Sequence, residues 1–270
     1  MALLENKVAF ITGAARGQGR NHAVRFAREG ADIIALDICA SVSDDVGYPA
    51  ATPEDLEETA RLVRAEGREI VTAIGDVRDQ SDLQAAVDAG VERFGRLDIV
   101  VANAGISTWN RFWEMPEEQW TTMIDINLNG VWRTLKAAVP AMIDGGRGGS
   151  IIVVSSAAGI KASPGTSNYT SAKHGLVGLT KTAAIELGEF GIRVNSIHPG
   201  AVDTPMGQDA NVGKILAQYP RYIDNYKWPL AGLSKCSVDD VSEVVLYLAS
   251  DRSRTVTGSQ MSLDLGITSI

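Results

Sequence analysis

The sequence predicts a single α/β domain built on a doubly wound parallel sheet of seven strands, with helices on both faces. Short runs rich in β-branched residues alternate with longer segments of helical periodicity from one end of the chain to the other. This alternation is typical of repeated βαβ units, which form parallel sheets. No Pro-rich or charged linker divides the 270 residues, so one domain over residues 1–270 is expected.

The expected elements follow one another in a regular order. The seven predicted strands are residues 8–12, 32–36, 70–75, 97–102, 150–155, 193–198 and 260–264. The predicted helices are residues 17–29, 54–66, 81–94, 117–143, 169–189 and 238–250. Because strands joined by helices run parallel, their carboxyl ends are expected to form one edge of the sheet, where such folds bind ligands.

The composition argues against several classes of partner and site. A net charge of −8 without a clustered basic run disfavours a nucleic-acid binder. No apolar stretch reaches the ~18 residues of a membrane span, and the N-terminus does not resemble a signal peptide, so a cytoplasmic protein is expected. Cys39 and Cys236 lie far apart, and His174 and His198 have no ligand constellation. Neither a disulfide nor a metal site is therefore predicted.

A glycine-rich turn follows the first predicted strand and opens the first predicted helix. Gly13, Gly17 and Gly19 let the backbone of this turn approach a pyrophosphate, whose charge favours a helix N-terminus. Asp37 ends the second strand region, where a carboxylate can accept hydrogen bonds from an adenosine ribose. A plain glycine turn would have the same composition, but the turn and the carboxylate together predict a Rossmann-type dinucleotide site.

Two charged side chains bear on the choice of dinucleotide. The carboxylate of Asp37 repels a 2′-phosphate and favours NAD, whereas Arg16 is placed where it could neutralise such a phosphate and permit NADP. Because Asp37 is expected to meet the ribose directly, NAD is the predicted cofactor. The alternative for Arg16 is a solvated surface charge.

Tyr169 and Lys173 lie four residues apart at the start of a predicted helix, so their side chains share one face. A neighbouring ammonium is expected to lower the phenol pKa from ~10 and make Tyr169 a usable acid or base. Ser156 ends a strand region thirteen residues earlier, where its hydroxyl could bind a substrate oxygen. Ser155 is expected to face the other way and to be structural.

Taken together, these residues resemble the short-chain dehydrogenase/reductase family from about residue 7 to residue 264. The motifs stand in family order: the glycine turn at residues 12–19, Asp76-Val77, Asn103-Ala104-Gly105, Asn127, Ser156, Tyr169 with Lys173, and Pro199-Gly200 with Thr204. The resemblance implies hydride transfer between NAD and an alcohol or ketone. It implies a catalytic tetrad in which Tyr169 is the acid/base, Ser156 orients the substrate, Lys173 holds the nicotinamide ribose and Asn127 binds a proton-relaying water.

The same resemblance implies the cofactor contacts. Asp76 and Val77 are expected at the adenine, and Val202 and Thr204 at the carboxamide. The full expected set is Gly13, Arg16, Gly17, Gln18, Gly19, Asp37, Ile38, Asp76, Val77, Asn103, Ala104, Gly105, Tyr169, Lys173, Pro199, Gly200, Val202 and Thr204. Gln18 stands where the family commonly has isoleucine, and is expected to shift cofactor contacts rather than abolish binding.

Residues 38–53 form a connection of sixteen residues, where ~2–6 are usual. This segment and the wording of the glycine turn resemble an actinobacterial subgroup typified by carveol dehydrogenases, which are associated with the peptide-derived redox carrier mycofactocin. The resemblance implies that the segment folds over NAD and retains it, with electrons leaving through an external mycofactocin-type carrier. The alternative is an ordinary surface insertion.

After residues 38–53, residues 204–237 are the second long stretch that breaks the alternation of strands and helices. They are expected to form a substrate lid. Apolar surface on this lid would come from Met206, Tyr219, Tyr222, Tyr226 and Trp228, facing a wall formed by Trp109, Phe112 and Trp113. An apolar, terpenoid or steroid-like secondary alcohol or ketone is the expected substrate.

The family resemblance also implies a homotetramer, assembled through the helices that bear Asn127 and Tyr169. Two other functions stay open from the sequence. One is an NADPH-linked carbonyl or acyl-thioester reductase, which Asp37 disfavours. The other is a non-catalytic dinucleotide-binding protein, because a fold alone does not establish function.

Overall fold

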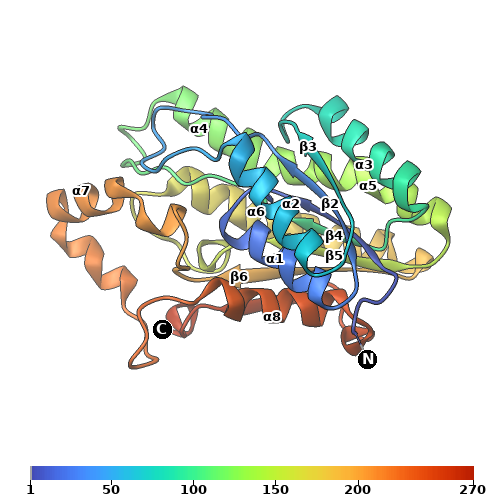
Figure 1. Cartoon of the computed structure of the whole chain (residues 1–270). Coiled ribbons are helices and arrows are strands. Elements are labelled where there is room, and N and C mark those ends of the chain that lie inside the picture. Colours follow the sequence, from blue (N-terminus) through green and yellow to red (C-terminus); the bar gives the residue numbers. More distant parts are fainter. Residues whose placement is uncertain (1) are drawn as a thin grey trace.

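The computed structural model describes residues 2–270 as one domain, in which a seven-stranded parallel sheet lies between two layers of helices (Figure 1). The strands are β1 (Val8–Thr12), β2 (Asp32–Asp37), β3 (Ile70–Ile74), β4 (Ile99–Ala102), β5 (Gly149–Val154), β6 (Ile192–Pro199) and β7 (Gln260–Leu263). The predicted fold class is confirmed. The strand order β3-β2-β1-β4-β5-β6-β7 reverses between β1 and β4, which is where doubly wound sheets open a ligand crevice.

Both faces of the sheet are buried because successive strand residues point to opposite sides. Phe10 packs into the core beneath one helix layer, and its neighbour Ile11 packs into the other. The layer on the Ile11 side contains α1 (Gly17–Arg28), α2 (Pro53–Ala65) and α8 (Val238–Ala249). The layer on the Phe10 side contains α3 (Gln80–Phe94), α4 (Glu117–Ile124), α5 (Gly130–Gly145) and α6 (Ser167–Glu186).

The expectation of one α-helix over residues 117–143 is wrong in its middle. A π-helical segment, Asp125–Asn129, separates α4 from α5. Asn127 points inward from this segment, and Gly130 packs so closely against Val77 that a Cβ there would lie 2.7 Å from a Val77 methyl carbon. Helical periodicity continues through the segment, so the sequence pattern does not reveal the wider turn.

Residues 204–237 contain a helix that the sequence pattern did not predict. Asp209 caps α7 (Ala210–Gln218) by accepting a hydrogen bond from the backbone N–H of Asn211 at 2.8 Å. Figure 1 shows α7 in orange on the same side of the molecule as α4. A bridge between Val202 and Cys236 closes the base of the segment.

None of the helices within residues 2–270 combines the length and the apolar character needed to cross a membrane. Within the same residues, His, Cys, Asp and Glu side chains do not gather in groups of three or more that could bind a metal ion.

Candidate active site

The glycine positions of the turn between β1 and α1 do not readily accept a side chain. Gly13 and Gly17 have positive φ angles of 66° and 56°, a conformation that favours glycine. A Cβ on Gly19 would lie 2.1 Å from the carbonyl oxygen of Gly13. The backbone is therefore exposed at the point where α1 begins, and its N–H groups can meet an anion.

Asp37 stands at the carboxyl end of β2 and is only 7% exposed. Its carboxylate accepts backbone hydrogen bonds from Ala15 and from Cys39, each at 3.0 Å. These bonds fix the carboxylate and tie the glycine turn to β2. Since each carboxylate oxygen has further acceptor capacity, Asp37 can still accept a ligand hydroxyl.

A groove crosses this edge of the sheet and collects most of the expected cofactor residues. Its walls include Gly13, Arg16, Gly17, Gln18, Asp37, Ile38, Asp76, Val77, Asn103, Ala104, Gly105 and Thr204. The other expected positions, Gly19, Tyr169, Lys173, Pro199, Gly200 and Val202, do not line the groove. Gly19 supports the turn, Gly200 donates its N–H to the carbonyl of Leu263, and Val202 is buried.

Two of the groove residues are held by bonds within the chain. The carboxylate of Asp76 pairs with the guanidinium of Arg78 at 2.6 Å. The amide of Asn103 donates to the carbonyl oxygens of Thr12 and Gly13, at 2.9 and 3.1 Å. The Asn103 amide therefore supports the backbone of the glycine turn and is not presented to a ligand. An orphaned buried oxygen, Oε1 of Gln18, has no partner within residues 2–270 and suits a ligand donor.

Ser156, Tyr169 and Lys173 meet beyond β5. Ser156 begins a short turn by accepting a hydrogen bond from the N–H of Ala158 at 3.1 Å. Lys173 is 4% exposed, lies 5.5 Å from the Tyr169 ring centroid and donates from Nζ to the carbonyl oxygen of Val154 at 2.8 Å. The hydroxyl of Ser156 is within hydrogen-bonding reach of Tyr169. A phenol, a hydroxyl and an amine thus face one position.

The electrostatics of this cluster differ from the expectation. Burial raises the pKa of the Tyr169 phenol, and the hydrogen bond with Ser156 acts in the opposite direction. Burial also lowers the pKa of Lys173 to about 8. The expected net lowering by Lys173 is therefore wrong for these side chains alone, because desolvation disfavours the charged forms of both groups.

Neighbouring polar residues fix the cluster in place. Ser155 is buried and donates from Oγ to the carbonyl oxygen of Lys173 at 3.0 Å, so it is structural, as predicted. His198 lies buried with Nδ1 2.8 Å from the carbonyl oxygen of Ser156. The amide of Asn127 accepts from the N–H of Ile106 at 2.9 Å and donates to its carbonyl at 2.8 Å. Asn127 thus locks the loop after β4 beside the cluster.

Comparison with known proteins identifies the family to which the chain belongs. The family model described as "Enoyl-(Acyl carrier protein) reductase" matches residues 13–268. An NAD-dependent oxidoreductase of Mycobacterium tuberculosis is 57% identical over 97% of this chain and 96% of its own length. The chain belongs to the short-chain dehydrogenase/reductase family.

Two further relatives of this short-chain dehydrogenase carry more specific names. The (-)-trans-carveol dehydrogenase of Rhodococcus erythropolis is 44% identical over 99% of both chains. The crystal structure of a carveol dehydrogenase from Mycobacterium avium in complex with NAD superposes with a TM-score of 0.94. That protein is 47% identical, and the match covers 100% of each chain.

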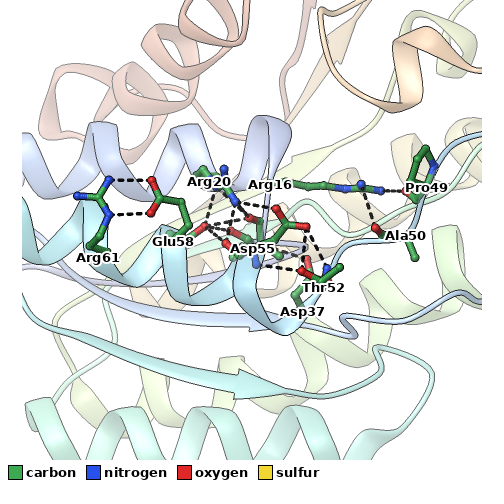
Figure 2. Close-up of polar contacts among 12 residues, drawn as sticks. Arg16, Arg20, Asp37, Pro49, Ala50, Thr52, Asp55, Glu58 and Arg61 are labelled. Carbon is green, nitrogen blue, oxygen red and sulfur yellow. Dashed lines mark hydrogen bonds and ion pairs between the residues drawn. The ribbon is translucent and has the colours of Figure 1, made fainter.

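Residues 38–53 of this short-chain dehydrogenase lie against the groove, which Val42, Val46 and Tyr48 help to line. Arg16 donates to the carbonyl oxygens of Pro49 and Ala50, the latter at 3.2 Å, as Figure 2 shows. The guanidinium therefore anchors the segment and is not a freely solvated charge. This pairing could not be predicted from the sequence, because carbonyl partners in a loop carry no residue-type signature.

The same segment also meets the residues after β6. The carbonyl oxygen of Gly47 accepts from the N–H of Ala210 at 3.4 Å, and that of Asp45 accepts from the amide of Asn211 at 3.3 Å. A Cβ on Gly47 would lie 2.0 Å from Oδ1 of Asp209, which is itself buried. We call this contact between residues 45–47 and 209–211 the seam.

Away from the seam, residues 204–237 contact aromatic and charged residues of the loop that follows β4. The rings of Trp109 and Tyr226 lie 6.2 Å apart, and a Cβ on Gly165 would lie 2.8 Å from a methyl carbon of Ile215. The guanidinium of Arg111 lies 4.3 Å from the ring centroid of Tyr219. The loop after β4 therefore contacts the residues that follow α7.

Proposed function

We propose that this protein is an NAD-dependent oxidoreductase that interconverts an apolar secondary alcohol and the corresponding ketone. The observation that carries the proposal is the meeting of Ser156, Tyr169 and Lys173 beside the groove that Asp37 lines, since a Cβ on the groove residue Gly105 would lie 3.7 Å from Nζ of Lys173. Such an arrangement sets a proton-transfer group beside the place where a dinucleotide can lie.

Each polar side chain of the cluster has a part in the proposed reaction. NAD, when bound, supplies the hydride acceptor. Ser156 donates a hydrogen bond to the substrate oxygen and orients it toward Tyr169, which takes the hydroxyl proton during oxidation and returns it during reduction. Lys173 stabilises the phenolate and holds the nicotinamide ribose. Because the side-chain oxygen and nitrogen of Asn127 each bond to Ile106, we assign the relay water to the main-chain carbonyl of Asn127.

The choice of NAD follows from the charges at the adenosine end. The buried carboxylate of Asp37 repels a 2′-phosphate. Arg16, which could have neutralised that phosphate, is committed to the carbonyl oxygens of Pro49 and Ala50. The NAD bound by the M. avium carveol dehydrogenase agrees with this assignment. The NADPH-linked reductase is therefore the weaker alternative.

We further propose that residues 38–53 retain NAD between turnovers, so that electrons leave through an external mycofactocin-type carrier. The segment has contacts on several sides of the groove: Arg16 binds Pro49 and Ala50, and the seam joins it to α7. A dinucleotide beneath it could leave only after these bonds had opened. An unattached surface insertion would not have these contacts.

The substrate class and the assembly are proposed on apolar surfaces. Residues 204–237 would act as a lid over an aromatic pocket for a terpenoid or steroid-like alcohol, in keeping with the carveol dehydrogenases among the relatives. Trp120, Trp132 and Ile185 are exposed on α4, α5 and α6, with 40%, 48% and 82% of their surface accessible. We propose that these side chains are buried between subunits of a homotetramer, and that the protein is cytoplasmic.

One experiment tests these proposals in sequence. Purified protein is desalted, denatured and examined by mass spectrometry for released dinucleotide, and a second sample is mixed with carveol, menthol and a hydroxysteroid. We expect released NAD, and repeated alcohol oxidation only when a dye such as dichlorophenolindophenol is added as acceptor. Released NADP would favour the reductase, and a redox-inert cofactor across the panel would favour a non-catalytic protein. Rapid turnover with free NAD alone would rule out retention but leave the dehydrogenase chemistry intact.

A further inference from the structure

Tyr48 lies in the middle of residues 38–53, yet it reaches the catalytic side of the groove. Its side chain lines the groove together with Gly13, Ile106 and Met206. The phenol oxygen accepts a hydrogen bond from the backbone N–H of Ser107 at 3.3 Å. Ser107 follows Ile106, the residue that Asn127 locks in place. Tyr48 therefore spans the groove from the segment that covers it to the loop beside the catalytic cluster.

The hydroxyl of Tyr48 has a hydrogen-bond donor that the protein does not use. A phenol can donate one hydrogen bond and accept others, and the N–H of Ser107 occupies only an acceptor position. No acceptor for the Tyr48 O–H is found within residues 2–270. Burial raises the pKa of this phenol, so the group keeps its proton at physiological pH. A shielded O–H without a partner is unfavourable, and a bound molecule that offers an oxygen would satisfy it.

The surroundings of Tyr48 indicate which molecule supplies that oxygen. Tyr48 shares the groove with Gly13 and Arg16, and its hydroxyl bonds to the loop after β4, so it lies between the glycine turn and the loop beside the catalytic cluster. A dinucleotide that runs from Asp37 to Tyr169 has phosphate and ribose oxygens over this stretch. Asp209 is the competing acceptor, because its Oδ2 is buried without a partner within the described residues.

We propose that Tyr48 is a further cofactor-positioning residue, whose O–H donates a hydrogen bond to a ribose or phosphate oxygen on the nicotinamide half of the dinucleotide. This inference rests on the proposed binding of NAD in the groove. It gives residues 38–53 a direct polar contact with the cofactor, in addition to their role as a cover. The bond to Ser107 sets the phenol ring in the position from which it donates.

The test replaces the hydroxyl and keeps the ring, with Tyr48→Phe in the full-length protein. The dissociation rate of NADH is followed by fluorescence after a chase with excess NAD, and the affinities of NAD and AMP are measured by calorimetry. We expect NADH to leave about tenfold faster from Tyr48→Phe, as loss of a hydrogen bond to a charged or polar oxygen implies. The affinity for AMP, which lacks the nicotinamide half, should stay within about twofold of the wild-type value.

Tyr247→Phe, in α8 and remote from the groove, is the matched control, and both variants are first compared with wild type by thermal unfolding. Unchanged NADH release from Tyr48→Phe would overturn the proposal. So would an equal loss of AMP and NAD affinity, because the hydroxyl would then only brace residues 38–53. If Asp209→Asn removes the effect of Tyr48→Phe on NADH release, the carboxylate is the acceptor and the proposal is wrong. The ratio of variant to wild-type rates decides the matter even if wild-type NAD exchanges quickly, so failure of NAD retention is distinguishable from failure at Tyr48.

Discussion

The catalytic cluster and the segments that cover the groove are held by different kinds of bond. Lys173 and Asn127 bond to backbone groups of β5 and of the loop after β4, Ser155 bonds to a backbone carbonyl of α6, and all three are buried. Residues 38–53 and 204–237, the covering segments, are hydrogen-bonded to each other at the seam, where the start of α7 meets backbone carbonyl groups of a loop. Phe112 and Trp113 on the facing wall are largely exposed.

Because the two regions are held differently, the chemical step and the exchange of ligands should depend on different residues. Groups fixed by buried bonds to a sheet keep their relative positions through each turnover, which proton transfer requires. Segments joined by a few loop contacts can open at small cost, which entry and exit require. Changes in the cluster should therefore alter the rate of the chemical step, whereas changes in the covering segments should alter the exchange of NAD and substrate.

The largest expected effect lies in the cluster. Tyr169→Phe should lower the rate of alcohol oxidation by about 10²- to 10⁴-fold, because the ring remains and only the acid/base group is lost. Affinity for NAD should change little. Single-turnover hydride transfer and calorimetric binding of NAD measure the two quantities separately. Near-normal oxidation by a folded Phe variant would contradict the assignment of Tyr169.

A smaller effect is expected at the adenosine end. Asp37→Asn should weaken NAD binding by about 10- to 100-fold, since a charge-assisted hydrogen bond is lost, and should reduce discrimination against NADP. The chemical step, measured at saturating NAD, should be preserved. Competition binding of NAD and NADP gives the ratio. A variant that still excludes NADP as well as the wild type would show that Asp37 does not set the preference.

The seam offers a test of the covering segments. Gly47→Ala should speed NADH release by about tenfold, because the added Cβ displaces Asp209 and costs one or two hydrogen bonds of about 1 kcal/mol each. Gly213→Ala in α7 is the matched control, since no atom lies within 4 Å of the Cβ that it would add. Release is followed by fluorescence of NADH. Equal rates in the two variants would mean that the seam does not retain the cofactor.

The last expected effect concerns the stability of the protein at acid pH and not a rate or an affinity. His22 is fully buried between α1 and α8, with Nδ1 2.7 Å from Ser242 Oγ, and burial lowers its pKa from 6.5 to about 3. Between these values the unfolded chain binds a proton that the native protein does not, so stability falls as pH drops, by about 1.4 kcal/mol per pH unit.

Urea unfolding of His22→Gln from pH 7 to pH 5 measures this contribution. The variant should lose less stability over the range than the wild type, even if it is less stable at pH 7. His174→Gln is the control, because His174 is exposed. If both variants follow the wild-type slope, protonation of His22 does not contribute to acid unfolding.

Local sequence patterns were sufficient to predict the sheet and the members of the cluster. Every predicted strand is present, with ends displaced by no more than two residues, because apolar periodicity is a local property of each strand. Tyr169 and Lys173 meet because four residues make about one helical turn. The position of Asp37 followed in the same way from the end of β2.

The cover of the groove and the protonation of the cluster depend on long-range contacts, which local patterns do not reveal. The π-helical segment at Asn127, the capping of α7 and the bond between Arg16 and Pro49 depend on partners that are distant in sequence or on backbone atoms. The pKa of Tyr169 is raised, whereas the sequence predicted a lowering, because desolvation depends on everything packed around the phenol. Local spacing determines which residues can meet, whereas burial and contacts between loops determine what they do once they have met.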